Sequence, residues 1–323
     1  MNLEYIEQLV APLMQHYRSA YRRLTHSDIP ILSDISEHIV QNSGKQLRPL
    51  ITMLTACNCG MPADTTPDNP VFDIAAAIEM LHNSTLIHDD VIDESELRRG
   101  EKTVNCIWGN KTAVLAGDYY LAKVMQTLEN IDNKKITRTI NDAVIEMSEG
   151  ELIQQQYCGR YDTGSDIYFK IIGKKTAVFM AACCKVGAIC ATDNTMLHEQ
   201  AYKIGYHIGI AFQLRDDMID FVPSEQSGKP QCNDIKEHKV TLPVIMALQN
   251  SNPNTKKEFL SLIQKKEFDD NETARIAAIV EQSGALEEVR HQMSERLIQA
   301  SQMLSSMPDN RYRDGMFKLI ESL

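Results

Sequence analysis

Two short acidic motifs are the part of the sequence most suited to chemistry. Residues 86–94 read LIHDDVIDE and residues 213–221 read QLRDDMIDF, so the pattern DDxxD occurs twice. On a helix successive residues turn by about 100°, which places the first and last aspartate of each motif about 40° apart on one face. The side chains concerned are Asp89, Asp90 and Asp93 in the first motif and Asp216, Asp217 and Asp220 in the second.

Three carboxylates this close repel one another unless a cation lies between them, and burying them without one is costly. Carboxylate oxygens on one helix face suit Mg²⁺, which binds one or two protein carboxylates together with waters and substrate phosphates. The competing explanation is a solvated acidic surface, although negative charge near a helix C-terminus opposes the helix dipole. Two copies in apolar surroundings favour the metal. If both helices face one cavity, the two motifs would grip one diphosphate from opposite sides.

Basic residues that could bind a second anion are spread along the chain. The turn SGKQLRP contains Lys45 and Arg48, and a spacing of three lets both side chains reach one phosphate group. His82 lies seven residues before Asp89, two helical turns back on the same face, which suits it to anion binding. Taken singly, the remaining candidates are more often surface charges. They are Arg98, Arg99, Lys174, Lys175 with the following Thr176, Lys229 and Lys239.

The placement of proline indicates which elements carry these residues. No proline occurs from residue 71 to residue 222, and few segments there alternate with period two. Proline breaks helix interiors, so this interval predicts consecutive helices separated by polar turns. The predicted helices cover residues 72–97, 111–131, 137–158, 168–190 and 197–222. Shorter helices are predicted from Thr241 onward, and we expect one all-α domain over residues 1–323, a bundle of long helices.

Composition excludes several classes of protein. The chain has 33 basic and 44 acidic residues and a net charge of −11, which argues against nucleic acid as a partner. No window approaches 18 uninterrupted apolar residues, so no transmembrane helix is expected, and the N-terminal segment lacks the pattern of a signal peptide. The eight cysteines contain no CxxC pair and are predicted to be buried, reduced thiols of a cytoplasmic protein.

In their order along the chain these motifs resemble those of a known family, the trans-isoprenyl diphosphate synthases or polyprenyl synthetases. GKQLRP is similar to the family's GKxxRP, and LIHDDVIDESELRRG is similar to its first aspartate-rich motif with the trailing RRG. GDYYLA, KTA and FQLRDDMID follow, and GKPQCNDIKEHKVTLP is similar to GKxxGxDxxxGKxTLP. The ordered set covers most of the chain and is far more specific than any single motif.

The resemblance implies an all-α fold around a deep central cavity, usually in a homodimer, and an enzyme that condenses an allylic diphosphate with isopentenyl diphosphate and releases pyrophosphate. It implies Mg²⁺ as cofactor, with Asp89, Asp93, Asp216 and Asp220 as metal ligands and Asp90 and Asp217 supporting catalysis. The isopentenyl diphosphate site would comprise Lys45, Arg48, His82 and Arg99. The allylic side would comprise Arg98, Lys175, Thr176, Gln213 and Lys229. Lys175 also counts among the catalytic residues, and Lys239 among those that bind substrate.

The chain departs from the family pattern at two places. Family glycines of the late loop are replaced by Cys232 and His238, which puts the closed form of that loop in doubt because glycine often supplies backbone freedom. The usual double glycine before Lys45 is Ser43-Gly44.

Product length is predicted from the residues that precede Asp89. Ser84 and Thr85 lie four to five residues back, roughly 6 to 7.5 Å along the helix axis. In the family bulky aromatic residues here block the cavity and give short products, so these small residues predict a medium-long or long product, around the octaprenyl class. We expect Met80, Leu81, Tyr119, Tyr120 or Met125 to form the floor, and the product to be delivered to a membrane.

Other functions remain open at this point. A short-chain synthase, making geranylgeranyl or farnesyl diphosphate, would share every motif. A terpene cyclase or head-to-head synthase also uses aspartate-rich helices, but it has no need of a second diphosphate site. His88-Asp89 suggests an HD-type phosphohydrolase, which would leave the second DDxxD unexplained. A non-catalytic subunit of a heteromeric synthase would usually have lost the aspartates.

Overall fold

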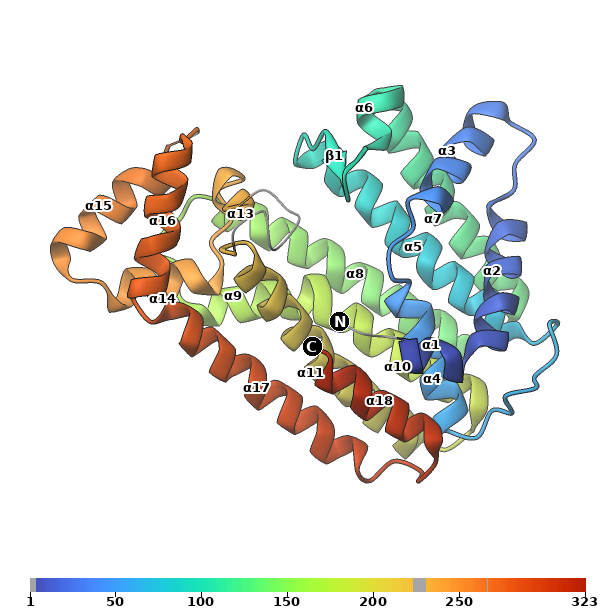
Figure 1. Cartoon of the computed structure of the whole chain (residues 1–323). Helices are drawn as coiled ribbons and strands as arrows, with labels where there is room; N and C mark the ends of the chain where they lie inside the picture. Colours follow the sequence, from blue (N-terminus) through green and yellow to red (C-terminus); the bar gives the residue numbers. More distant parts are fainter. Residues whose placement is uncertain (1–3, 223–230, 266) are drawn as a thin grey trace. The chain divides into compact units, whose positions relative to one another are not determined.

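The computed structural model describes residues 4–222, 231–265 and 267–323, and most of these residues are in helices (Figure 1). The prediction of an all-α fold is confirmed. The first helices are α1 (Glu4–Leu9), α2 (Ala11–Thr25), α3 (Pro30–Gln41), α4 (Leu47–Asn58), α5 (Pro70–Ile92), α6 (Val104–Trp108), α7 (Asn110–Ile131), α8 (Lys134–Tyr157) and α9 (Ser165–Ile172). The π-helix η1 (Gly173–Ala177) follows, and then α10 (Val178–Ala191), α11 (Thr195–Ile219), α13 (Asn233–Lys236), α14 (Leu242–Asn250), α15 (Pro253–Ile263), α16 (Asp270–Gln282), α17 (Ala285–Leu304) and α18 (Arg311–Glu321).

The chain forms two compact units. Unit 1 contains the described residues of 1–141, 182–202 and 304–322, and unit 2 contains those of 142–181 and 203–303 together with residue 323. The first acidic motif lies in unit 1 and the second in unit 2. The single domain over residues 1–323 and the central cavity stay predictions.

Helix α5 organises unit 1, because it packs against α7, α2 and α4. Its start is fixed by Asn69, whose side chain accepts a hydrogen bond from the backbone N–H of Val71, and by Pro70, whose ring suits the first helical turn. Ala75, Ala76 and Ala77 are fully buried, and such small side chains let the neighbouring helices approach closely. The unit thereby holds the C-terminal turn of α5, with its aspartates, in a fixed place.

The helix predicted over residues 72–97 is too long, because α5 ends at Ile92. The two-stranded antiparallel sheet β1 (Leu97–Arg98) and β2 (Glu101–Lys102) follows, with Arg98 paired to Glu101. Arg99 and Gly100 form the two-residue turn, with φ angles of 57° and 86°. Positive φ at both central residues is the signature of a type I′ hairpin, which a glycine in second place favours. The RRG motif is therefore a hairpin that follows the acidic motif.

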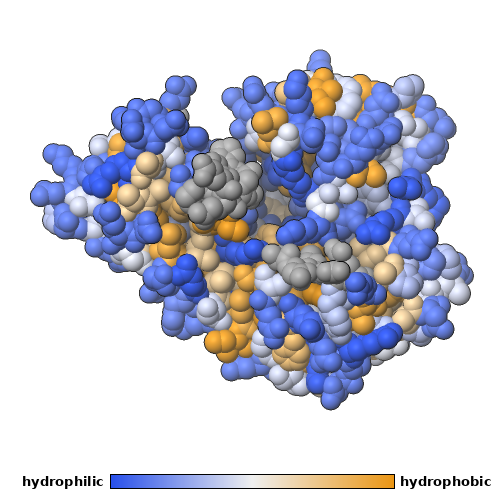
Figure 2. Space-filling model, in the orientation of Figure 1, coloured by the Kyte–Doolittle hydropathy of each residue, from blue (hydrophilic) through white to orange (hydrophobic). Residues whose placement is uncertain are grey.

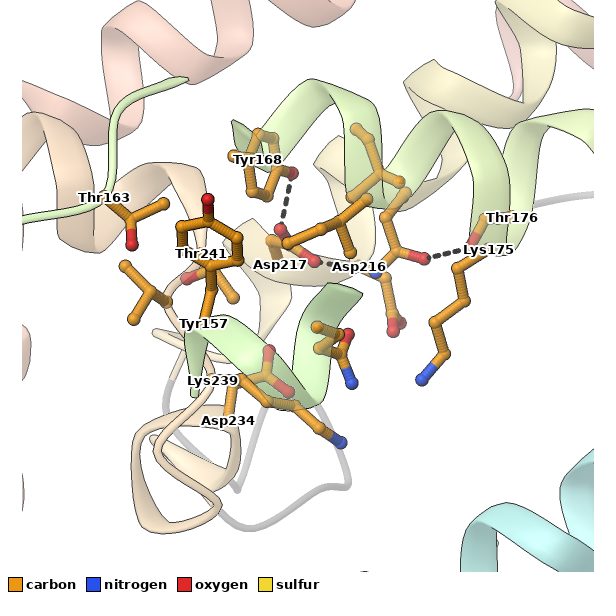
Figure 3. Close-up of a pocket in the computed structure, with 15 residues that line it drawn as sticks. Tyr157, Thr163, Tyr168, Lys175, Thr176, Asp216, Asp217, Asp234, Lys239 and Thr241 are labelled. Carbon is orange, nitrogen blue, oxygen red and sulfur yellow. Dashed lines mark hydrogen bonds between the residues drawn. The ribbon is translucent and has the colours of Figure 1, made fainter. Parts of the chain in front are cut away.

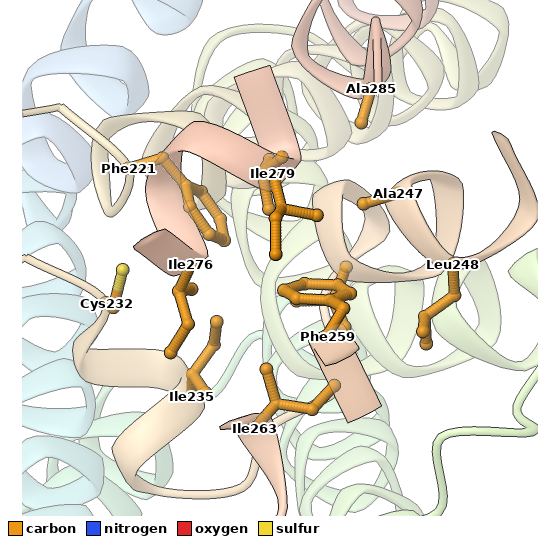
Figure 4. Close-up of a cluster of buried hydrophobic side chains, with 12 residues drawn as sticks. Phe221, Cys232, Ile235, Ala247, Leu248, Phe259, Ile263, Ile276, Ile279 and Ala285 are labelled. Atoms are coloured by element: carbon orange, nitrogen blue, oxygen red, sulfur yellow. The ribbon is translucent and has the colours of Figure 1, made fainter. Parts of the chain in front are cut away.

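Unit 2 contains two apolar clusters that support the second acidic motif. One joins Phe221, Cys232 and Ile235 to side chains of α14, α15 and α16 (Figure 4). The other joins Tyr168, Ile210 and Leu214 to α14 and α17. Burial of this apolar surface anchors both ends of the segment from α11 to α14 among the described residues.

The predicted helix 168–190 is interrupted by the π-helix η1. A Cβ atom on Gly150 of α8 would lie 2.7 Å from the backbone nitrogen of Lys175, and one on Gly209 of α11 would lie 2.6 Å from Cα of Ala177. Only glycine permits such close approach of backbones. Two helices therefore press directly on η1, and single π turns inside helices frequently mark functional sites.

The cysteines are free thiols, as predicted, but not all of them are buried. All eight cysteines lie among the described residues and none is in a disulfide, but Cys106 and Cys158 are exposed, so the prediction of buried thiols is wrong for these two. Among the described residues no helix has the length and apolar character needed to cross a membrane. The face shown in Figure 2 is mostly hydrophilic, with scattered apolar patches.

Candidate functional site

The three aspartates of the first motif differ in their surroundings. Asp89 and Asp93 are half-buried in and just after the last turn of α5, where the backbone N–H of Asp93 donates to the carbonyl oxygen of Asp89 at 2.8 Å. Asp90 is only 4% exposed, its Oδ1 accepts a hydrogen bond from Nε of Arg98 at 2.8 Å, and Nη2 of Arg98 completes the ion pair at 2.6 Å. The hairpin after α5 therefore supplies the counter-charge of Asp90.

Burial and pairing act in opposite directions on this ion pair. Burial raises the pKa of the Asp90 carboxyl, and Arg98 offsets part of that rise. Burial disfavours the charged form of Arg98, but its hydrogen bond to Asp90 and the charges of Asp89 and Asp93 raise its pKa overall. The carboxylate of Asp90 is thus held by Arg98, whereas Asp89 and Asp93 are the half-buried members of the motif.

Four predicted residues of the isopentenyl diphosphate site gather beside this motif in unit 1. A Cβ atom on Gly44 would lie 2.6 Å from the guanidinium carbon of Arg99, so Arg99 covers the backbone next to Lys45. Burial lowers the pKa of Arg48, and the nearby charge of Arg99 lowers it further. Burial, Arg48 and Arg99 together hold the pKa of His82 well below its usual range, so this histidine is neutral at pH 7.

Glu79 supplies the negative charge in this group of cations. It lies three residues before His82 on α5 and is 6% exposed. Burial raises the pKa of its carboxyl, while Arg48 and Arg99 lower it. Sequence reasoning missed Glu79, although its position one turn before His82 in IEMLH was a usable signal. The structure brings Arg48, His82 and Arg99 close to one another and adds Glu79 among them, while Lys45 is exposed next to Gly44.

The two predicted chain-length residues face different neighbours. The Ser84 hydroxyl is buried and donates to the carbonyl oxygen of Gly117 on α7 at 2.8 Å. Thr85 is half-buried and its hydroxyl donates to the carbonyl oxygen of His82 at 2.8 Å. Of the predicted floor residues, Met80, Leu81 and Tyr120 are buried. Met125 is 62% exposed on α7, so its assignment to a floor inside this unit is wrong.

A pocket in unit 2 is lined by several of the residues predicted around the second motif, although Asp220 is not among them (Figure 3). Asp216 and Gln213 come from α11, while Lys175 and Thr176 come from η1. The Thr176 hydroxyl donates to Oε1 of Gln213 at 2.8 Å, which ties the π turn to α11. Other residues lining the pocket are Tyr157, Thr163, Tyr168, Asp217, Asp234, Lys239 and Thr241. Lys229 lies outside the described residues.

Asp217 is buried and held from two sides. Its Oδ2 accepts a hydrogen bond from the hydroxyl of Tyr168 at 2.6 Å, and its Oδ1 accepts one from Nε2 of Gln213 at 2.8 Å. Burial raises the pKa of Asp217 well above its usual range, and the charge of Asp234 adds to the rise. Tyr168 was missed by sequence reasoning, and no motif marks it.

Asp220 binds backbone N–H groups at the start of α13. Its two carboxylate oxygens accept hydrogen bonds from the backbone N–H groups of Asn233 at 2.9 Å and Asp234 at 3.2 Å. Its backbone carbonyl accepts the N–H of Cys232 at 2.8 Å. The loop segment with Asp234 and Lys239 is therefore fastened to the end of α11, a positioning task that the assignment of Asp220 as a metal ligand did not foresee.

The lysines of η1 are paired with acidic residues of α8. Lys175 forms an ion pair with Glu151, and Lys174 pairs with Glu146 and Glu149, the latter at 2.7 Å. Lys239, at the opposite edge of the pocket in Figure 3, pairs with Glu237. Lys175 and Lys239 thus bring positive charge to a pocket that is also lined by the carboxylates of Asp216, Asp217 and Asp234.

Comparison with known proteins identifies the family. A model described as polyprenyl synthetase matches residues 29–281. The all-trans-nonaprenyl-diphosphate synthase (geranyl-diphosphate specific) of Rhodobacter capsulatus is 34% identical over 326 residues, which cover 99% of this chain and 97% of the relative. The chain belongs to the polyprenyl synthetase family.

Further polyprenyl synthetases are similar over the whole chain. Octaprenyl diphosphate synthase of Escherichia coli is 31% identical and covers 99% of this chain and 97% of its own. The crystal structure of a Caulobacter crescentus polyprenyl synthase, complexed with calcium and isoprenyl diphosphate, matches with a TM-score of 0.93 and 30% identity, over 99% of this chain and 96% of that one.

Membership of the polyprenyl synthetase family confirms the prediction of a prenyltransferase that elongates prenyl diphosphates. The terpene cyclase and HD-type phosphohydrolase alternatives are set aside. His88, which suggested the latter, lies 3.2 Å from the carbonyl oxygen of Val114 and 3.5 Å from Asp118 on α7, so its ring is part of the packing of α5 on α7. Mg²⁺, the homodimer, the cytoplasmic location and the roles of the individual site residues stay predictions.

The donor set of this polyprenyl synthetase fits a metal that shares its coordination with substrate. Among the described residues no three His, Cys, Asp or Glu side chains are grouped so as to hold a metal ion by themselves. Mg²⁺ commonly takes only one or two carboxylates and completes its shell with waters and phosphate oxygens. The half-buried Asp89, Asp93 and Asp216 offer carboxylates of this kind.

The pKa of Asp220 makes the stability of the metal-free enzyme depend on pH. Burial raises this pKa to about 8 from 3.8, and Asp234 adds to the shift. The folded carboxyl binds its proton more tightly than the unfolded one, so protonation of Asp220 stabilises the folded state. This contribution to the free energy of unfolding is complete below pH 3.8 and is lost as the pH rises through about 8. We expect the free energy of unfolding to fall over this range, with a shallower slope in Asp220→Asn.

Urea denaturation in the presence of a chelator, at several pH values between about 4.5 and 8.5, measures both slopes. Asp28→Asn is the control, because the side chain of Asp28 is fully exposed and the substitution should leave the slope unchanged. A slope in Asp220→Asn as steep as that of the wild type would contradict the expectation.

Proposed function

We propose that this prenyltransferase adds isopentenyl units to an allylic diphosphate to make a medium-long or long polyprenyl diphosphate. The observation that carries the proposal is the presence of two chemically distinct groups of side chains. Unit 1 has the cations Lys45, Arg48 and Arg99 with the neutral His82, and unit 2 has a pocket of carboxylates edged by lysines. A condensation of two diphosphates needs two such sites, whereas an ionisation alone needs one.

The cationic group of unit 1 suits the diphosphate of isopentenyl diphosphate. Arg48 lies in the first turn of α4, where backbone N–H groups favour anions, and guanidinium groups bind phosphate oxygens in pairs. A ring N–H of His82 can donate a hydrogen bond to a phosphate oxygen there. These residues would hold the isopentenyl double bond close to its partner, and such proximity supplies much of the rate.

The carboxylates and lysines suit the allylic diphosphate with its metal ions. Asp89 and Asp93, and Asp216 with Asp220 in unit 2, are the ligands we assign, and Lys175, Thr176, Gln213 and Lys239 the contacts to the diphosphate. Bound Mg²⁺ would supply charge neutralisation as the pyrophosphate leaves. The relative from Caulobacter crescentus, whose complex contains calcium and isoprenyl diphosphate, supports a divalent cation. The released pyrophosphate is the proton acceptor we assign to the final elimination.

Loss of a predicted metal ligand should abolish turnover without unfolding the chain. Asp89→Ala and Asp216→Ala should each lower kcat by at least about 100-fold, the scale of losing one electrostatic contact to a transition state. Product formation from a labelled isopentenyl diphosphate and an allylic primer with Mg²⁺ measures the effect, and circular dichroism checks helicity. Asp193→Ala, which removes a fully exposed carboxylate, should be as active as the wild type. Near-normal activity of Asp89→Ala would refute the role given to Asp89.

The fold alone does not determine the length of the product. Relatives of similar identity are named for nonaprenyl, heptaprenyl and octaprenyl products. A geranylgeranyl pyrophosphate synthetase from Pyrococcus horikoshii nevertheless has the same fold, with a TM-score of 0.88 and 26% identity. The small Thr85, in the half-buried stripe of α5 that also contains His82 and Asp89, favours the longer products.

A bulky side chain at position 84 or 85 should shorten the product. Thr85→Phe places its ring on the half-buried stripe, so we expect shorter chains and little loss of stability. Ser84→Phe should also shorten the product, but Ser84 lies against the backbone of Gly117, and overpacking there should cost about 1–3 kcal/mol of stability. Chromatography of dephosphorylated products and thermal denaturation measure the two effects. An unchanged product length in both variants would contradict the assignment of Ser84 and Thr85 as chain-length residues.

The homodimer is supported by apolar side chains on the outer face of α7. Leu115 and Met125 are 64% and 62% exposed, and Val114 is also exposed. Val114 and Met125 are eleven residues apart, three helical turns, so they share one face of the helix. Leu115 lies about 80–100° around the helix from these two residues. Exposed apolar side chains are common at subunit contacts, and we assign the face of α7 with Val114 and Met125 to the dimer interface.

A charge on this face of α7 should weaken the dimer. We expect Met125→Glu to sediment as a monomer at concentrations where the wild type is dimeric. Met196→Glu is the matched control, because Met196 is an exposed apolar residue on α11 and its replacement should leave the dimer intact. Sedimentation velocity measures both. Dissociation in neither variant, or in both, would speak against this interface.

A further inference from the structure

His238 adopts a backbone conformation that side chains rarely take. Its φ angle is 55°, in the left-handed region, where a Cβ atom is unfavourable and glycine is the usual choice. Cys232, which directly precedes α13, also has a positive φ of 58°, but its side chain is fully buried in the apolar cluster of Figure 4. His238 is half-buried and polar, so its conformation is maintained by other contacts.

The contacts of His238 join three segments of unit 2. Its backbone N–H donates to the carbonyl oxygen of Ile235 at 2.9 Å, and its carbonyl oxygen accepts the N–H of Gly159 at 2.9 Å. Its ring nitrogen Nδ1 lies 3.3 Å from the hydroxyl oxygen of Tyr161. That hydroxyl donates to the carbonyl oxygen of Ile263, the last residue of α15, at 2.5 Å. A phenol has one proton, so Nδ1–H of His238 is the donor to Tyr161.

This junction lies directly behind two residues of the pocket. Lys239 follows His238 in the chain, and its backbone N–H donates to the carbonyl oxygen of Asp234 at 2.8 Å. The N–H of Asp234 in turn donates to the carboxylate of Asp220 at 3.2 Å. Both Lys239 and Asp234 line the pocket, side by side at one edge of Figure 3. A change in the backbone at His238 would therefore shift Lys239 and Asp234, which line the pocket.

We propose that His238 and Tyr161 form a latch that positions Lys239 and Asp234 for binding of the metal–diphosphate group. The latch is the hydrogen bond between the two side chains together with the bond from Tyr161 to Ile263. It compensates for the unfavourable φ of His238 and ties the residues after α13 to Tyr161 and to the end of α15. His238 and Tyr161 are positioning residues, since the groups that line the pocket are Lys239 and Asp234. The proposal rests on the function proposed above.

A set of substitutions separates the latch from the backbone conformation. His238→Gly keeps the left-handed conformation and removes the hydrogen bond. His238→Asn also tolerates this conformation and retains a donor at the place of Nδ1. Tyr161→Phe removes the hydroxyl from the other side. The comparison of the Gly and Asn variants therefore isolates the hydrogen bond, and the double variant His238→Gly/Tyr161→Phe tests whether both residues act in one unit.

We expect His238→Gly and Tyr161→Phe each to raise KM for the allylic diphosphate and the half-saturating Mg²⁺ concentration about 5- to 20-fold, with KM for isopentenyl diphosphate unchanged. His238→Asn should recover most of the loss, and the double variant should be no worse than the poorer single one. Kinetic values within twofold of the wild type in both single variants would overturn the latch. So would an equal loss in the Asn variant, or a lowered Tm without any kinetic change.

Binding of Mg²⁺ with inorganic pyrophosphate, measured by calorimetry, keeps this test separate from the proposed function. Weaker binding in the Gly and Phe variants that recovers in the Asn variant supports the latch even if the wild type forms no elongated product, a result that would refute the proposed function alone. Equal binding in all variants would overturn the latch while leaving the proposed function standing.

Discussion

The central physical constraint in this structure is the cost of placing several carboxylates on one stretch of helix. A buried charge without a partner costs several kcal/mol, even after the protein has relaxed around it. Each motif meets this cost by giving its middle aspartate a dedicated partner. Asp90 is held by Arg98, and Asp217 is held by Tyr168 and Gln213. The aspartates that precede them, Asp89 and Asp216, are half-buried in both motifs. The first two aspartates of DDxxD therefore have the same kind of surroundings in the two units, whereas the third differs, because Asp93 is half-buried and Asp220 is buried and bonded to the backbone of α13.

Irregular elements contribute to the surroundings of both buried aspartates, directly at Asp90 and through Gln213 of α11 at Asp217. Arg98 is supplied by a two-residue hairpin whose turn needs positive φ at Arg99 and Gly100. Thr176, which orients Gln213 and through it Asp217, is supplied by the π-helix η1. The hairpin brings a counter-charge to Asp90, whereas the π turn brings a neutral hydroxyl that holds Gln213. The close contact of η1 with the backbones of α8 and α11 fixes where the π turn lies.

The sequence predicted the helices and the chemistry of the motifs well, because both depend on local spacing. The all-α fold follows from proline placement and helical periodicity, and the ordered motifs indicated the family. The boundaries of elements were less accurate. The end of α5 at Ile92 and the π turn at Gly173–Ala177 depend on tertiary packing that no local pattern records. Glu79 and Tyr168 were missed for a related reason, since each matters through residues distant in sequence, Arg48 and Asp217. Asp220 was assigned as a ligand by its spacing, and its bonds to the backbone of Asn233 and Asp234 became visible only in three dimensions.

The two residues of the late loop that replace family glycines, Cys232 and His238, show how a local rule can be broken without loss of the fold. Both Cys232 and His238 adopt the left-handed conformation that glycine would take freely, at a cost of roughly 1–2 kcal/mol each. At Cys232 the gain from burying a small apolar side chain is of similar size, since full burial of apolar surface contributes about 25 cal/mol per Å². At His238 the compensation is polar and directional, through Tyr161 and the backbone of Gly159. A glycine at either position would relieve the strain but remove the side chain that ties the turn to its surroundings. The described segment from Cys232 to His238 thus exchanges backbone freedom for side-chain anchoring, and it holds Asp234 and the adjoining Lys239 at the edge of the pocket.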